Sequence, residues 1–298
     1  MRNFVKIPLF GILFFFILWI AAEYFVKIID TDYTHKYRHV HNNSAITTLL
    51  IGASLCENGI NPRLIQDNDS IYNFATAGRW IYWDVLLSEK LFPTMPNLRT
   101  VLFPIGYDVM YYSLHYGTCR PTDEIDIYNY SKYMNVYYDK KPYKYTCRSA
   151  LYLNQMGLKL WKPLNYDAMG FLPLTDQAPQ WEVDATSTSV FNETTPQKCY
   201  HEYLQYLTEL AQTCHNYSIR LIAITPPCSN YYLQNVQPQG IQNLYDLIDS
   251  VRTHYPIEYH NYLDDAQFRA DSIYYNANHL NAIGADMFSL RVKADFNL

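Results

Sequence analysis

The stretch "LLIGASLCENGI" (49–60) places a serine just after a run of apolar residues. Residues 45–54 predict a short buried strand that ends in small residues. Gly52 permits a tight turn, and Ser54 would then stand at a helix start, where backbone N–H groups can hold an oxyanion. A serine placed there is suited to nucleophilic attack, although it can also serve simply as a helix N-cap.

Short apolar runs alternate with helical patterns along the rest of the chain. Over 194–216, for example, Tyr203, Leu207 and Leu210 fall on one face of a helix. Strands that alternate with helices indicate crossover connections, a parallel sheet and an α/β fold. Besides 45–54, we expect strands over 70–78, 98–106, 219–227 and 257–263, and helices over 62–66, 81–92, 194–216, 240–254 and 281–296.

Small or polar residues stand at the ends of three predicted strands. They are the segments GAS (52–54), TAG (76–78) and IGYD (105–108). Because the active groups of an open α/β sheet lie beyond the carboxyl ends of its strands, we expect these three ends to border one site. Gly78 would let a second backbone N–H approach the serine, although a glycine there also suits a plain turn.

The stretch "NANHLNAIGA" (276–285) places a histidine between two asparagines, far downstream of the serine. His279 is a candidate general base, and the alternative is a helix start capped by Asn278 or Asn281. We expect His279 and Ser54 to converge at the carboxyl edge of the sheet, with Nε2 and Oγ roughly 2.6–3.2 Å apart.

These motifs, in this order, resemble the SGNH/GDSL hydrolase family over about 45–110 and 190–298. Residues 52–55 (Gly-Ala-Ser-Leu) are similar to its first block, Gly78 to the glycine of its second block, and residues 276–279 to its last block, D-x-x-H. The resemblance implies a three-layer, flavodoxin-like sandwich around a parallel sheet. The segment after the histidine is typical of the family's membrane-anchored envelope members. Those proteins act in O-acylation of surface polymers, including teichoic-acid D-alanylation and exopolysaccharide acetylation.

The resemblance implies a role for each matched residue. Ser54 would be the nucleophile and His279 the general base, with neither a cofactor nor a metal. The backbone N–H groups of Ser54 and Gly78 would form the oxyanion hole. The third block of the family has an asparagine where this chain has Asp108, and an ionised acid donates no hydrogen bond. Asn73 is then the alternative side-chain donor.

Asn276 stands where the family has the acid of its triad. That acid orients the histidine and stabilises the imidazolium, and replacing it by asparagine in a serine protease lowers kcat about 10⁴-fold. Cysteine proteases do work with an asparagine, and Asp264, Asp265 or Asp271 would be further candidates for the acid. The sequence thus leaves open an active site with another acid, a weakened site and an inactive one.

The N-terminal residues form a separate part of the chain. The run "IPLFGILFFFILWIAA" (7–22) has no charge, and positive residues precede it. A bilayer core requires about 20 apolar residues, so residues 1–29 are predicted to be a membrane anchor, with one helix over 7–28 and Met1 in the cytoplasm. The alternative is a cleaved signal peptide. Both place the rest of the chain outside the cytoplasm, in the periplasm or at the cell surface.

Residues 30–44 are predicted to be a solvated, His-rich linker before a domain over 45–298. A Tyr-rich insertion is expected within that domain, over about 107–190. Metal binding by the linker histidines is disfavoured, because no acidic or cysteine partner follows at ligand spacing. The net charge of −5 and the lack of a basic run exclude a nucleic-acid partner. The six cysteines could form disulfides outside the cytoplasm, and their spacing does not select a pairing.

The sequence favours a membrane-anchored extracytoplasmic serine esterase or O-acyltransferase that acts on acylated cell-surface polysaccharide. The alternative is a non-catalytic relative that binds a glycan or serves as an accessory subunit of a membrane-bound O-acyltransferase. Asn276, Asp108 and the Tyr-rich insertion motivate this alternative, because aromatic rings stack on sugars. A structural envelope protein without a ligand is disfavoured by the intact serine and histidine motifs.

Overall fold

The structure, a computed structural model, describes residues 6–28, 31–66, 68–107, 110, 123–138, 166–176 and 197–298. The chain forms two compact units. Residues 1–37 with 121–164 make the first unit, and residues 38–120 with 165–298 make the second.

The second unit is built on a parallel sheet of five strands in the order β2-β1-β3-β4-β5. The first three strands are fully buried, as expected of a sheet that is covered on both faces. The predicted α/β fold with a parallel sheet is confirmed. The strands are β1 (Thr48–Leu50), β2 (Ile71–Asn73), β3 (Thr100–Pro104), β4 (Arg220–Thr225) and β5 (Glu258–Asn261).

The strand order changes direction next to β1. Leu50 of β1 lies opposite Asn73 of β2 on one side and Leu102 of β3 on the other, so the chain runs outward to β2 and then crosses back to β3. In sheets with this flavodoxin-like order, the ligand site lies beyond the carboxyl ends of β1 and β3. Ser54 follows β1 and Tyr107 follows β3, which places both at this point.

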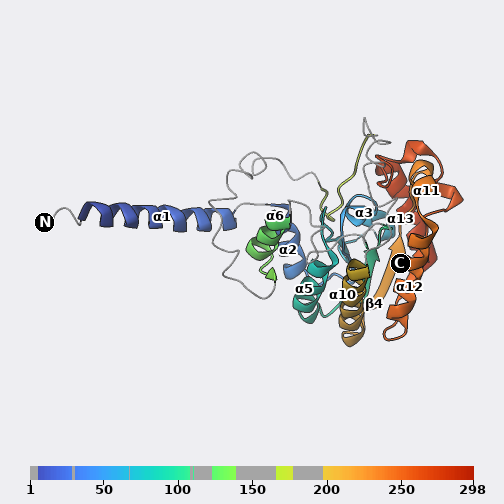
Figure 1. The fold of residues 1–298 in the computed structure, drawn as a ribbon, viewed down its shortest axis with the longest axis horizontal. Helices are drawn as coiled ribbons and strands as arrows, with labels where there is room; N and C mark the ends of the chain where they lie inside the picture. The colour runs from blue at the N-terminus through green and yellow to red at the C-terminus, as the bar shows by residue number, and fades with distance from the viewer. Residues whose placement is uncertain are drawn as a thin grey trace. The chain divides into compact units, whose positions relative to one another are not determined.

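Two sets of helices cover the sheet. The helices α5 (Ile81–Leu91), α10 (Gln197–Asn216) and α12 (Pro238–Arg252) connect strands in one direction, and α10 packs against both of the others (Figure 1). The connection that runs the opposite way contains α4 (Pro62–Ile65), which packs against α13 (Ala282–Phe296). Because parallel crossovers are right-handed, connections of opposite direction lie on opposite faces, and the result is a three-layer sandwich. The described residues of this unit also form α3 (Ser54–Glu57), η1 (Phe92–Thr94), α11 (Asn230–Asn235), η5 (Ala266–Phe268) and η6 (Asp271–Ile273).

Residues 166–176 lie within the predicted insertion but belong to the core of the second unit. Met169 and Phe171 are buried in the same apolar cluster as the sheet and α13. The backbone N–H of Asn73 donates to the Met169 carbonyl at 2.8 Å, which covers the outer edge of β2. The insertion predicted over 107–190 is therefore not a single addition. The periodicity did not reveal this because these residues form neither a helix nor a strand.

The first unit contains α1 (Lys6–Ile28), the beginning of α2 (Asp32–Asn42) and α6 (Asp123–Tyr133). The helix predicted over 7–28 is thus present. Among the residues that the structure describes, no helix is long and apolar enough to cross a membrane, so the predicted span has no support from the structure.

The described side chains of the first unit join its helices. The Tyr33 hydroxyl donates to Asp126 Oδ1 at 3.3 Å, and the ring of Tyr33 meets that of Tyr130 edge-on. Lys132 forms an ion pair with Glu23.

The solvated linker predicted over 30–44 is largely helical in the structure, because α2 covers residues 32–42. Tyr33, Tyr37 and Val40 recur at helical spacing, a pattern that the polar composition of this segment obscured. Val40 is buried, so the segment is not fully solvated.

Four of the six cysteines are described, and all four are buried without a disulfide to one another: Cys56, Cys199, Cys214 and Cys228. Cys119 and Cys147 lie outside the described residues. The suggested disulfides therefore do not form among the described cysteines.

Candidate active site

Ser54 stands at the first position of α3, just beyond the carboxyl end of β1. Gly52 makes the turn with φ +110°, and a Cβ there would lie 3.2 Å from the Phe103 ring, so both backbone and space favour glycine. The N-cap position belongs to Ala53, whose side chain makes no capping bond. Ser54 is therefore not the N-cap of this helix, and its hydroxyl is available for another role.

His279 lies in the loop before α13, with Nε2 at 2.8 Å from Ser54 Oγ. An isolated antiparallel bridge between Tyr274 and Leu280 closes this loop. Asn281 caps α13, because its side-chain oxygen accepts a backbone N–H of the first turn at 3.1 Å. The structure thus brings the two sequence-predicted residues together beside the point where the strand order changes direction.

Asn276 holds the other side of the imidazole ring, with Oδ1 at 3.0 Å from His279 Nδ1. The same oxygen accepts the backbone N–H groups of Asn278 at 3.2 Å and of His279 at 2.9 Å. Only the oxygen of an amide can accept, so these two bonds direct the Asn276 oxygen toward the ring. Nδ1 therefore carries the proton, and Nε2 accepts the hydrogen of the Ser54 hydroxyl.

Burial lowers the pKa of His279 to about 4. The described contacts of its ring are with Ser54, Asn276 and Asn278, whose Oδ1 lies 2.8 Å from Nδ1. Amide oxygens accept the Nδ1 hydrogen but carry no charge, so they stabilise an imidazolium only weakly. At neutral pH the histidine is consequently in its base form.

None of the three acids that the sequence offered has a described contact with His279. Asp264 forms an ion pair with Arg269, Asp265 caps the start of η5, and Asp271 is exposed at the start of η6. Within the described part of the chain, none of them contacts the imidazole, so none orients it. Asn276 and Asn278 contact Nδ1 of the ring instead.

Asn73 cannot serve as the oxyanion donor considered above. Its side-chain nitrogen donates to the carbonyls of Cys56 at 2.9 Å and Ile60 at 3.1 Å, so both of its hydrogens are used. Its oxygen accepts the N–H of Ala75 at 3.2 Å. Asn73 is fully buried and joins β2 to α3, which is a structural role.

Gly78 lies in the exposed turn after β2, with φ +74°. The preceding N–H group, that of Ala77, donates to the buried carboxylate of Glu57 at 2.8 Å. Glu57 belongs to α3, so this bond ties the turn to the helix that carries Ser54. Asp108, at the third strand end, lies outside the described residues.

A buried ion pair beneath these two turns was missed by the sequence analysis. Arg79 Nη1 lies 3.2 Å from Asp84 Oδ1, and the same oxygen accepts the backbone N–H of Gly52 at 3.2 Å. The pair therefore links the turn before Ser54 to the turn at Gly78. Burial raises the pKa of Asp84, and Arg79 acts in the opposite direction. The sequence did contain a signal for this pair. Asp84 lies among the apolar residues of 81–92, and an acid in such a buried segment rarely lacks a partner.

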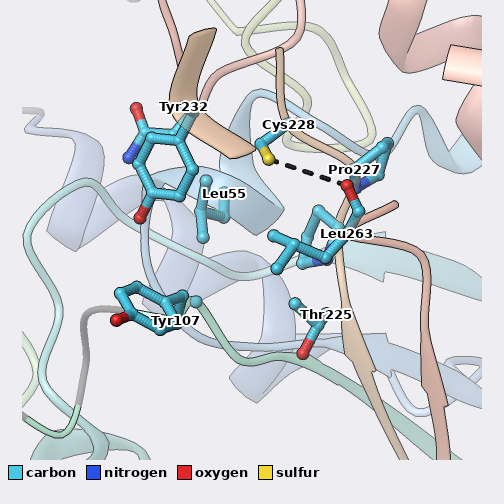
Figure 2. Close-up of a pocket in the computed structure, with 10 residues that line it drawn as sticks. Leu55, Tyr107, Thr225, Pro227, Cys228, Tyr232 and Leu263 are labelled. Carbon is cyan, nitrogen blue, oxygen red and sulfur yellow. Dashed lines mark hydrogen bonds between the residues drawn. The ribbon is translucent and has the colours of Figure 1, made fainter. Parts of the chain in front are cut away.

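A cavity of about 10 Å³ is lined by residues that neighbour the serine and the histidine in the sequence (Figure 2). Its walls come from the residue after Ser54, from the ends of β3 and β4, and from the histidine loop. They include Leu55, Tyr107, Cys228, Tyr232, Leu263 and Asn278.

No protein-family model matches the chain, and no curated protein matches it. It is similar to a solved structure described as "a putative platelet activating factor" from Streptococcus pneumonia, with a TM-score of 0.46 and 14% identity, over 97% of this chain and 99% of that one. It is also similar to "a putative acylhydrolase" from Bacteroides fragilis, with a TM-score of 0.42 and 9% identity, over 84% of this chain and 86% of that one.

Proposed function

We propose that the protein is a serine esterase or O-acyltransferase, with Ser54 as nucleophile and His279 as general base. One observation carries the proposal: Ser54 Oγ lies 2.8 Å from His279 Nε2, while the opposite ring nitrogen is held by the oxygen of Asn276 at 3.0 Å. A nucleophile, a base and a group that orients the base, in hydrogen-bond sequence, form the usual machinery of covalent acyl transfer.

In the first step, Ser54 Oγ bonds to the acyl carbon of an ester and its proton moves to His279 Nε2. The carbonyl oxygen becomes an oxyanion, for which the backbone N–H groups of Ser54 and Gly78 are the proposed donors. When the C=O bond re-forms, the alcohol leaves with the proton from Nε2. The acyl group stays on Ser54.

In the second step, water or a sugar hydroxyl attacks the acyl-enzyme while His279 again accepts the proton. Attack by water releases the free acid and makes the protein an esterase. Attack by a sugar hydroxyl forms a new ester and makes it an O-acyltransferase.

The proposed substrate is acylated cell-surface polysaccharide, and the proposed location is the outer face of a membrane. The support comes from the resemblance to envelope members of the SGNH/GDSL family and from the uncharged run at 7–22. In α1, Phe10 and Phe15 expose 70% and 71% of their surface, and exposed apolar side chains of this kind suit contact with lipid. A membrane-bound O-acyltransferase is the proposed partner.

Fractionation of cells tests the location. The full chain should remain in the membrane pellet after a high-salt wash, whereas a chain without residues 1–29 should be released. Release of the full chain by the same wash would contradict anchoring.

A fluorophosphonate probe tests the activity, because it labels an activated serine covalently. The full chain should be labelled and should hydrolyse p-nitrophenyl acetate, and Ser54→Ala should lose both properties. Ser250→Ala, a change on the surface of α12, is the matched control and should behave as the unchanged protein. If the unchanged protein and Ser54→Ala give equal signals in both assays, the enzyme proposal is wrong and the accessory-subunit alternative replaces it.

A further inference from the structure

We infer that Asn278 is a second positioning residue of this site, which accepts the Nδ1 hydrogen of His279 and shares with Asn276 the orienting role of a triad acid. The inference rests on the proposed function, because it concerns the general base of that reaction. In the D-x-x-H block, the residue directly before the histidine is an unspecified position, so the resemblance gives Asn278 no role.

The side-chain oxygen of Asn276 is already engaged by the backbone. It accepts the N–H group of Asn278 at 3.2 Å and that of His279 at 2.9 Å. An amide oxygen has two lone pairs, so these two bonds use its ordinary accepting capacity. His279 Nδ1, at 3.0 Å, is a third donor to the same oxygen. Asn276 is therefore a crowded acceptor for the imidazole hydrogen.

Asn278 offers an acceptor without this competition. Its Oδ1 lies 2.8 Å from His279 Nδ1, which is shorter than the 3.0 Å between Nδ1 and the Asn276 oxygen. Among the hydrogen bonds of the described residues, no other donor reaches the Asn278 oxygen. Both the distance and the available lone pairs therefore give Asn278 at least an equal share of the Nδ1 hydrogen.

The orientation of the Asn278 amide follows from its neighbours. The two backbone N–H groups fix the Asn276 oxygen toward the ring, so Nδ1 carries the hydrogen. Asn278 must then present its oxygen, because its NH2 group would set a second hydrogen against that of Nδ1. The two amides thus select the same tautomer, which leaves Nε2 free to accept the hydrogen of Ser54 at 2.8 Å.

The two asparagines differ in what else they hold. The backbone N–H of Tyr275 donates to the His279 carbonyl at 2.9 Å and closes a turn, which the Asn276 side chain also holds through its two backbone bonds. Within the described part of the chain, the Asn278 side chain bonds to no backbone group. Loss of Asn276 would therefore disturb both the turn and the ring, whereas loss of Asn278 acts on the ring.

The first test compares the rate with the stability in the full chain. Asn278→Ala should lower kcat/KM for p-nitrophenyl acetate roughly three- to tenfold, the effect of one neutral hydrogen bond, and leave the midpoint of urea unfolding nearly unchanged. Asn281→Ala is the matched control. The Asn281 side chain accepts the Gly284 N–H at 3.1 Å and donates to the Ser272 carbonyl at 2.8 Å, so this variant should lower the midpoint and keep kcat/KM.

The second test adds a charge at the same place. Asn278→Asp has nearly the same shape, keeps an acceptor for Nδ1 and should raise kcat/KM about tenfold, because charged acceptors form stronger hydrogen bonds. The described ring contacts of His279 are with Ser54, Asn276 and Asn278, none of which is charged. The new carboxylate should therefore raise the pKa of His279 and move the acidic fall of the pH profile to higher pH. Asn281→Asp, the same change at the cap of α13, should move it less.

The outcomes separate this inference from the proposed function. If Ser54→Ala hydrolyses the ester as fast as the unchanged protein, the proposed function and the inference both fail. If hydrolysis depends on Ser54, either of two results overturns the inference and leaves the esterase function standing. One is full kcat/KM in folded Asn278→Ala, and the other is an acidic fall in Asn278→Asp that moves no further than in Asn281→Asp.

Discussion

Asn276 occupies the place of a triad acid, but it can supply only one of the two contributions that an acid makes. An acid selects the tautomer of the histidine and stabilises the imidazolium. Here the backbone N–H groups of Asn278 and His279 direct the Asn276 oxygen toward the ring, at 3.2 and 2.9 Å, so the productive tautomer is kept. Only the negative charge is missing. The loss that asparagine causes when it imposes the wrong tautomer is therefore not expected at this site.

We expect Asn276→Asp to raise kcat/KM for p-nitrophenyl acetate about tenfold, which corresponds to about 1.4 kcal/mol of transition-state stabilisation. The carboxylate would keep the two backbone bonds and add the charge that stabilises the imidazolium. Steady-state kinetics measure the gain, and the same change in a Ser54→Ala background should produce none. An unchanged or lower rate would show that the charge of this residue does not limit the reaction.

The pH dependence of the reaction should follow His279, because only its neutral form can accept the serine proton. Burial lowers its pKa to about 4, so kcat/KM should be constant at neutral pH and fall as the pH drops through about 4. Asn276→Asp favours the imidazolium, raises this pKa and should move the acidic fall to higher pH. Initial rates across acidic and neutral buffers give both profiles. A fall near pH 6.5 in the unchanged protein, the ordinary value for histidine, would contradict this assignment.

At the scale of the elements, α5 supports the site through the side chain of Asp84. Asp84 extends from this helix into the interior, where it pairs with Arg79 and accepts the N–H of Gly52. Their side chains are 1% and 0% exposed, so the pair is shielded from water. A buried pair is strongly destabilised when one partner is lost, because an uncompensated charge remains.

Asp84→Asn should therefore lower the free energy of unfolding by about 3–5 kcal/mol. Glu258→Gln is the matched control, because the Arg220–Glu258 pair lies at the surface with side chains 37% and 47% exposed. Its effect should stay within about 1 kcal/mol. Urea unfolding of the three proteins measures both values, and equal losses would contradict a special role for the buried pair.

At the scale of the whole molecule, residues 166–176 join parts of the second unit that are distant in the sequence. The Leu172 N–H donates to the Glu57 carbonyl at 3.1 Å, and the Leu174 carbonyl accepts the Ala282 N–H at 2.7 Å. The segment thus connects α3 with the start of α13, the two elements that flank the serine and the histidine.

Gly170→Ala should destabilise the protein by about 1–3 kcal/mol, because Gly170 has φ +81° and the new Cβ would lie 2.2 Å from the Asn73 carbonyl oxygen. Asp176→Ala is the control in the same segment, where the exposed carboxylate accepts the Thr175 hydroxyl at 3.3 Å. The midpoint of urea unfolding should fall for the first variant and stay for the second. A fall of similar size in both would mean that the close approach at Gly170 does not matter.

Much of the sheet could be predicted because its signals are local. Buried strands such as Thr100–Pro104 are short apolar runs, and α10 shows a clear apolar stripe. The helix α2 and residues 166–176 were not recognised, because the first is polar in composition and the second has no regular period. Among the oxyanion candidates, Asn73 was misjudged, because the two carbonyls that engage its amide approach it only in the folded chain.

The sequence by itself determined the turn of Gly52 and Ser54 after a buried strand and the histidine loop before the last helix, because apolar runs and turn residues act over a few neighbours. Only the tertiary structure decided which side chains contact Nδ1 of His279. Asp264, Asp265, Asp271 and Asn276 all lie within reach of it along the chain, and spacing does not rank them. Folding engages Asp264 and Asp265 in other contacts and leaves Asp271 exposed, and two backbone N–H groups turn the Asn276 oxygen toward the ring. Such a choice depends on contacts between chain segments, and these form only when the sheet brings its strand ends together.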